Sequence, residues 1–164
     1  MKLPVVDTTI TLTEIPDHIS FAIMIGNCCR KCKGCHSSYL QYKLPEKLWT
    51  NVDQLVKQAQ KAKEQGATAI LLMGGTTNGI KPDVLQYAIE QLSKVLPVGV
   101  YSGADYHSIY NIILRDDPNL TWLKTGDFIE ELGGLDSPDT NQQFFARDKK
   151  SGEWKDVTYL FRKE

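Results

Sequence analysis

Short apolar runs alternate with amphipathic segments along most of the chain, and this alternation restricts the folds available to it. Residues 20–25, 67–73 and 98–101 are apolar runs of strand length, which is typical of strands buried on both faces. Between them, residues 51–65 and 82–95 carry apolar side chains at helical spacing. Because parallel neighbouring strands need a crossover connection, the pattern predicts an α/β fold with a mostly parallel sheet.

The remaining segments complete this prediction. Residues 8–13 alternate apolar and polar side chains and predict a strand, while residues 106–114 and 120–124 predict a short third helix and another core strand. In the tail, residues 142–147 and 154–161 flank a turn, which predicts a C-terminal β-hairpin. The strand–helix units are too few for a closed eight-stranded barrel. We therefore expect an open partial (βα) barrel with mostly parallel strands and a C-terminal β-hairpin.

All four cysteines of the chain lie within residues 28–35, directly after the first buried run. Cys28, Cys32 and Cys35 have the spacing C-x3-C-x2-C. Three thiolates on a short loop can hold three irons of a cubane iron–sulfur cluster and leave the fourth iron open for a substrate. Three basic side chains in the same loop favour the thiolate form of these cysteines. The pattern indicates a ligand set.

Other interpretations of this cluster also follow from the residues. A disulfide framework is disfavoured because the cysteines are too close together to join distant elements. Structural zinc could be held by cysteines together with His36, although zinc ligands usually form two separated pairs. Residues 32–36 also fit the C-x-x-C-H pattern of covalent haem attachment, but the strand–helix pattern argues against a small helical haem protein. The register is open as well, because Cys29 could replace Cys28.

The cysteine motif after an apolar strand resembles the cluster motif of radical S-adenosylmethionine (SAM) enzymes. More narrowly, the chain resembles the activating proteins of the anaerobic ribonucleoside-triphosphate reductase. The stretches that carry this resemblance are C-K-G-C-H at 32–36, L-M-G-G at 72–75, Y-S-G at 101–103 and G-D-F-I-E-E-L-G-G-L-D-S-P at 126–138, with Asn141-Gln142 after them. The resemblance implies that residues 1–164 form a single radical SAM domain with a partial barrel of that type. Its core spans about residues 18–146, and the hairpin spans about residues 142–161.

The resemblance also implies cofactors. It implies a [4Fe-4S] cluster held by Cys28, Cys32 and Cys35, and it favours Cys28 over Cys29 as the first ligand. S-adenosyl-L-methionine would bind the open iron, and its reductive cleavage would give methionine and a 5′-deoxyadenosyl radical. No catalytic residue is implied beyond the cluster ligands, because the cofactor carries the chemistry while the protein positions it and excludes water.

Further residues are implied as SAM contacts, namely Gly34, His36, Gly74, Gly75 and Ser102. The alternatives are a polar loop residue for His36, a plain turn for the glycine pair and a helix cap for Ser102. The chain departs from the family after the glycines, where an acidic residue is usual and Thr76-Thr77-Asn78 stand instead. We hypothesise that Thr76 or Asn78 accepts a hydrogen bond from the SAM amine without the charge of a carboxylate.

The implied partners are the large glycyl radical subunit of the reductase and an electron donor such as flavodoxin. The glycine-rich loop 133–138 could receive the flexible peptide that carries the target glycine, and a plain surface turn is the alternative. Asp136 and Asn141 are weaker candidate contacts in the same region. A net charge of −1 provides no electrostatic attraction for nucleic acid or an anionic membrane.

The composition fits one soluble domain, with 164 residues of which 41% are hydrophobic and 24% are charged. No apolar run approaches the roughly 20 residues that span a bilayer, and the N-terminal segment does not have the pattern of a signal peptide. We therefore expect a cytoplasmic protein.

The resemblance to reductase activators therefore implies an enzyme, a radical SAM activase and oxidoreductase that generates a glycyl radical on the anaerobic ribonucleoside-triphosphate reductase. Within the same chemistry, the alternatives are an activase of another glycyl radical enzyme or another small radical SAM enzyme. The alternative from a different class is a non-catalytic zinc-binding module.

Overall fold

The computed structural model describes residues 1–26, 44–74, 80–103, 107–126 and 129–161. Its strands are β1 Lys2–Leu3, β2 Val5–Thr11, β3 Ser20–Ile25, β4 Thr50–Asn51, β5 Ala69–Met73, β6 Val98–Tyr101, β7 Leu120–Thr125, β8 Gln143–Arg147 and β9 Trp154–Asp156. Its helices are α1 Val52–Glu64, α2 Pro82–Ser93 and α3 Ile109–Arg115, with short 3₁₀ helices η2 Glu46–Leu48 and η3 Thr158–Phe161. Most of the predicted segments thus form strands and helices of the expected type, at the predicted ends or within a few residues of them; the exception is the last segment, 154–161, which is a strand only as far as Asp156.

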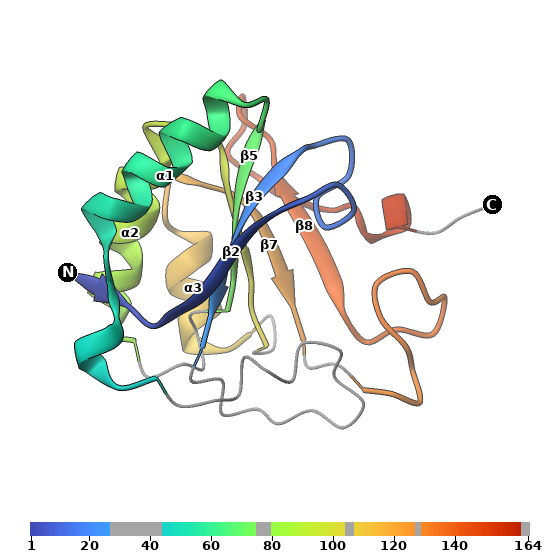
Figure 1. The fold of residues 1–164 in the computed structure, drawn as a ribbon. Coiled ribbons are helices and arrows are strands. Elements are labelled where there is room, and N and C mark those ends of the chain that lie inside the picture. The colour runs from blue at the N-terminus through green and yellow to red at the C-terminus, as the bar shows by residue number, and fades with distance from the viewer. Residues whose placement is uncertain (27–43, 75–79, 104–106, 127–128, 162–164) are drawn as a thin grey trace.

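A seven-stranded sheet in the order β2-β3-β5-β6-β7-β8-β9 organises the molecule, and β1 pairs with β4 beside it. The four central strands β3, β5, β6 and β7 are parallel. The helices α1, α2 and α3 connect them and lie together on one side of the sheet (Figure 1). This is the arrangement that successive crossovers of one hand produce.

The expectation of an open partial (βα) barrel with mostly parallel strands is wrong. Three pairings of the large sheet are parallel, but β2–β3, β7–β8 and β8–β9 are antiparallel, so the sheet is mixed and carries three short helices. The reason lies in the connections. Residues 12–19 join β2 to β3 and are too few for a crossover, and the described residues between β7 and β8 form turns without a helix.

The tail pairs as a hairpin but is shorter than predicted. β8 and β9 are antiparallel neighbours, whereas the second strand ends at Asp156 and does not continue to Phe161. Asp156 Oδ1 accepts the Thr158 N–H at 2.9 Å, which turns the chain into η3. The Thr158 Oγ1 in turn accepts the Phe144 N–H at 2.9 Å. A local side-chain hydrogen bond therefore competes with the strand and ends it.

Apolar side chains cover both faces of the sheet. On the helical side, the core joins the strands to buried residues of α1 and α2, such as Leu55, Leu85 and Ile89. On the opposite side, Ile15, Ala69, Leu71 and Phe144 form a smaller cluster that the 12–19 connection and η3 cover. In the described ranges, no helix has the length and apolar composition needed to cross a membrane.

Candidate functional site

The carboxyl ends of the four parallel strands meet at one edge of the sheet, where ligand sites of α/β folds commonly lie. Met24, Met73, Tyr101 and Lys124 are paired in register across β3, β5, β6 and β7. Residues paired in this way point to the same face of a sheet, and all four are half-buried. We call these four residues the edge row. They place two thioethers, a phenol and an amine along one line.

Two of the predicted SAM contacts lie directly after this row. Gly74 follows β5 with a φ of 114°, and its N–H donates to the Tyr101 carbonyl at 2.9 Å. Ser102 follows β6, is fully buried and donates its N–H to the Lys124 carbonyl at 2.8 Å. The structure therefore brings Gly74 and Ser102 to neighbouring positions. Ser102 is not the cap of α3, since Ser108 has that role.

Most of the other predicted site residues lie outside the described residues. They are Cys28, Cys32, Cys35, Gly34, His36, Gly75, Thr76 and Asn78. The extra cysteine of the loop, Cys29, belongs to the same range. Their assigned roles remain predictions from the sequence.

The cofactor prediction of a [4Fe-4S] cluster with S-adenosyl-L-methionine is corrected here. Across residues 1–26, 44–74, 80–103, 107–126 and 129–161, no group of three or more histidine, cysteine, aspartate or glutamate side chains could hold a metal ion. The cysteines that were expected to hold the cluster are not among these residues. The described residues thus contradict the cofactor prediction, which rested on sequence spacing alone.

Tyr101 is a titratable group of the edge row whose pKa is strongly shifted. Its hydroxyl donates to the backbone carbonyl of Glu14 on the 12–19 connection. Burial raises the pKa of Tyr101 well above its usual value, and the charge of Glu14 and a hydrogen bond to it add to the rise. The Lys124 Nζ lies 5.3 Å from the Tyr101 ring centroid, within the range of a cation–π contact. The phenol therefore stays protonated beside a cation.

No sequence motif singles out Met24 or Lys124, whereas Met73 and Tyr101 appear only as members of the L-M-G-G and Y-S-G stretches. A usable signal was present. Each of these residues is the last or second-last of its strand, and the alternation of side chains in strands assigns them to one face once the register is known. The register itself depends on pairing between distant segments, which the local sequence pattern does not specify.

The glycine-rich loop is tied to the same end of the sheet. Gly133 has a φ of 80°, and the Thr140 Oγ1 donates to its carbonyl at 3.1 Å. The Gln142 Nε2 donates to the carbonyl of Gly126, which follows β7, at 3.3 Å. Asp136 and Asn141 are exposed on this loop. The described part of the loop is thus folded by internal hydrogen bonds, and the Gln142 side chain ties its end to the residue after β7.

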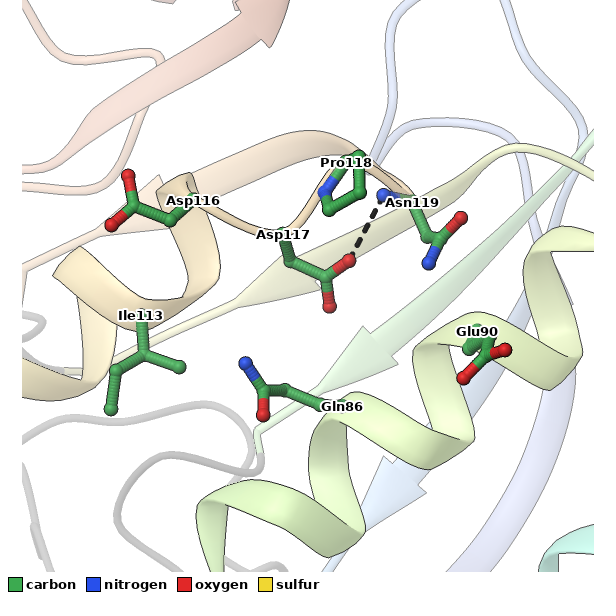
Figure 2. A pocket seen from close by; sticks show the side chains of 7 residues that line it. All are labelled: Gln86, Glu90, Ile113, Asp116, Asp117, Pro118 and Asn119. Carbon is green, nitrogen blue, oxygen red and sulfur yellow. Dashed lines mark hydrogen bonds between the residues drawn. The ribbon is translucent and has the colours of Figure 1, made fainter.

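A cavity of about 400 Å³ lies elsewhere, between α2 and the turn that precedes β7 (Figure 2). Gln86 and Glu90 of α2 face Asp117 and Asn119 of the turn. The Asp117 Oδ1 accepts the Asn119 N–H at 2.9 Å. Because this turn leads into the amino end of β7, the cavity is remote from the carboxyl edge and from every described residue of the predicted site.

Comparisons with models of protein families, with curated proteins and with solved structures return no match. The resemblance to reductase activators accordingly rests on the motifs of the sequence.

Proposed function

We propose that this protein is a cytoplasmic activating enzyme that generates a radical on a glycine of the anaerobic ribonucleoside-triphosphate reductase. The product would be a carbon-centred radical at the Cα of that glycine. An electron donor such as flavodoxin, and the glycyl radical subunit itself, are the proposed protein partners. Neither nucleic acid nor a membrane is a proposed partner.

One observation supports this proposal above the others, namely the parallel register of β3, β5, β6 and β7. The segments that resemble reductase activators follow these strands in the sequence. Gly74 and Ser102 come after β5 and β6, the loop 126–142 comes after β7, and the cysteine segment comes after β3. Motifs that are far apart in the sequence are thus connected to strand ends at a single edge.

The direct test is electron paramagnetic resonance of the reductase after anaerobic incubation with this protein. SAM and dithionite are added in all four combinations, and iron, sulfide and zinc are measured on the same sample. We expect an organic radical signal that requires this protein and that shows glycine Cα–H coupling. Absence of the signal in every combination contradicts the proposal, and stoichiometric zinc without a radical identifies the metal-binding module instead.

The four cysteines offer a matched pair of variants for the same assay. Cys28→Ala removes a residue of the C-x3-C-x2-C spacing, whereas Cys29→Ala removes the neighbouring thiol that this spacing does not use. We expect Cys28→Ala to abolish the radical signal and Cys29→Ala to retain at least half of it. The reverse result would show that Cys29, and not Cys28, is the first residue of the functional cysteine set. A radical signal retained equally in both variants would show that neither cysteine is needed for radical formation.

A further inference from the structure

The cavity between α2 and the turn that precedes β7 has acidic and amide side chains on its walls (Figure 2). Glu90, Asp116 and Asp117 provide carboxylates, and Gln86 and Asn119 provide amides. Among the described residues that line the cavity, none has a basic side chain. The cavity therefore offers several hydrogen-bond acceptors, and its lining contains no cation to balance the carboxylates.

Asp117 is the residue that points to a ligand. Its side chain is directed into the cavity (Figure 2), and the residue is only 6% exposed. Its Oδ1 accepts the Asn119 N–H at 2.9 Å, whereas its Oδ2 has no hydrogen-bond partner among the described residues. Because a buried carboxylate is normally paired with a cation or bound to a metal, Asp117 lacks the partner that its surroundings require.

In the described ranges, neither a basic side chain nor a metal site provides that partner. Arg147 contacts the same residue, but its Nη2 donates to the main-chain carbonyl of Asp117 at 2.8 Å and forms no ion pair with the carboxylate. No group of three or more histidine, cysteine, aspartate or glutamate side chains in these ranges could hold a metal ion. The missing partner is therefore an organic cation from outside the chain.

We propose that this cavity binds a guanidinium group carried on an alkyl chain, which is the chemistry of an arginine side chain. A guanidinium directs five N–H donors from one plane, which suits acceptors on both walls, with Asp117 on the turn and Gln86 and Glu90 on α2. Ile113 and Pro118 add apolar surface that the alkyl chain covers. A volume of about 400 Å³ is within the range of small-molecule sites. The site is separate from the carboxyl edge and independent of the proposed function.

Titration of the whole chain at low salt, followed by amide chemical shifts in NMR spectroscopy, tests the proposal. The probes are L-arginine, N-acetyl-L-arginine amide and, as an uncharged control of the same shape, L-citrulline. We expect dissociation constants of about 0.1–1 mM for the guanidinium probes, shift changes mainly at residues 86–90 and 113–119, and at least tenfold weaker binding of citrulline. Tighter binding of free arginine identifies a small-molecule ligand, whereas equal or tighter binding of the amide identifies an arginine side chain of a peptide.

Variants separate this site from general electrostatic attraction. Asp117→Asn keeps an oxygen that can accept the Asn119 N–H but removes the charge, so it should weaken binding of the tighter guanidinium probe at least tenfold. Glu90→Gln changes an exposed residue that the fold does not need and should weaken binding severalfold. Glu64→Gln on α1 is the matched control, because it removes an exposed carboxylate outside the cavity, and it should leave binding unchanged.

Three results overturn the proposal. The first is no binding of either guanidinium probe up to about 10 mM, or shift changes that lie outside the cavity. The second is equal binding of citrulline and arginine, which would show that the charge is not recognised. The third is wild-type affinity in both Asp117→Asn and Glu90→Gln, or in Glu90→Gln alone if Asp117→Asn does not fold.

Discussion

Gly99 has no side chain, and this leaves room for Trp122 and Ile15 to pack on the face of the sheet that carries no helices. A Cβ at this position would lie 3.2 Å from the Trp122 Cβ and 3.3 Å from the Ile15 Cδ1. The Trp122 Cβ belongs to the neighbouring strand β7 and has little room to move. We expect Gly99→Ala to lower the free energy of unfolding by about 1–3 kcal/mol in urea denaturation.

A double-mutant cycle separates this steric effect from a general intolerance of the strand. Ile15→Val removes the Cδ1 atom that lies in the way, so the cost of Gly99→Ala should be smaller in the Ile15→Val background than in the wild type. An equal cost in both backgrounds would show that Ile15 does not limit the space, and a stable Gly99→Ala chain would refute the packing described here.

Tyr101 should make the stability of the protein sensitive to alkaline pH. In the unfolded chain the phenol ionises near its ordinary pKa of about 10, whereas burial, the charge of Glu14 and the hydrogen bond to it raise the folded-state pKa well above that value. The stabilisation is therefore complete below about pH 10 and is lost as the pH rises through the folded-state pKa. In that window the free energy of unfolding should fall by up to about 1.4 kcal/mol per pH unit.

The measurement is urea denaturation at several pH values between 8 and 11 for the wild type, Tyr101→Phe and Tyr159→Phe. Tyr101→Phe should lose about 1 kcal/mol at pH 8, because it cannot donate to the Glu14 carbonyl, but should decline less steeply above pH 10. Tyr159 is 63% exposed, so Tyr159→Phe should follow the wild type. Parallel slopes for the wild type and Tyr101→Phe would contradict the assigned pKa direction.

At the level of single elements, the local apolar pattern was sufficient to predict several strands and helices. The strands 20–25 and 98–101 were predicted at the ends that the structure shows. The strand predicted from Ala67 begins at Ala69, because the Ala67 N–H still donates to the carbonyl of Ala62 at the end of α1. Such capping contacts extend beyond the apolar pattern and shift the ends of elements without changing their type.

The start of α1 is a testable case of such a signal. The Asn51 side chain accepts the Asp53 N–H at 3.1 Å, as expected for an N-cap. Asn51→Ala should lower the free energy of unfolding by about 0.5–2 kcal/mol in urea, and Asn51→Ser should recover most of that loss. Gln54→Ala, on the exposed side of the same helix, should change stability by less than about 0.5 kcal/mol. A serine variant no better than alanine would argue against a capping role.

For the whole molecule, the directions of the strands and the arrangement of the site were beyond the reach of the sequence. β2 and β8 have ordinary strand patterns, and only the length of the connection or the pairing partner decides whether they run parallel or antiparallel. Likewise, Met73 and Lys124 become neighbours of Tyr101 only through register between separate segments. The cysteine spacing can be read directly from the sequence, but spacing alone does not establish that a cofactor is bound.

Arg147 of β8 joins the antiparallel part of the sheet to the turn before the parallel strand β7. Its Nε donates to the Leu120 carbonyl at 3.0 Å, and its Nη2 donates to the carbonyls of Arg115 and Asp117 at 2.6 and 2.8 Å. Its guanidinium carbon also lies 4.5 Å from the centroid of the Trp154 ring. One planar cation on β8 thereby fixes the turn between α3 and β7.

Lysine preserves the charge at this position but cannot direct several donors from one plane. We therefore expect Arg147→Lys to lower the free energy of unfolding by about 1.5–3 kcal/mol, since carbonyls of the turn lose charged donors. Lys149→Gln, an exposed change two residues away, should cost less than about 0.5 kcal/mol. Hydrogen exchange should show faster opening of residues 115–120 in Arg147→Lys only. If the two variants are equally stable, the halves of the sheet are held together by the strand ladder and apolar packing, and the guanidinium contacts contribute nothing measurable.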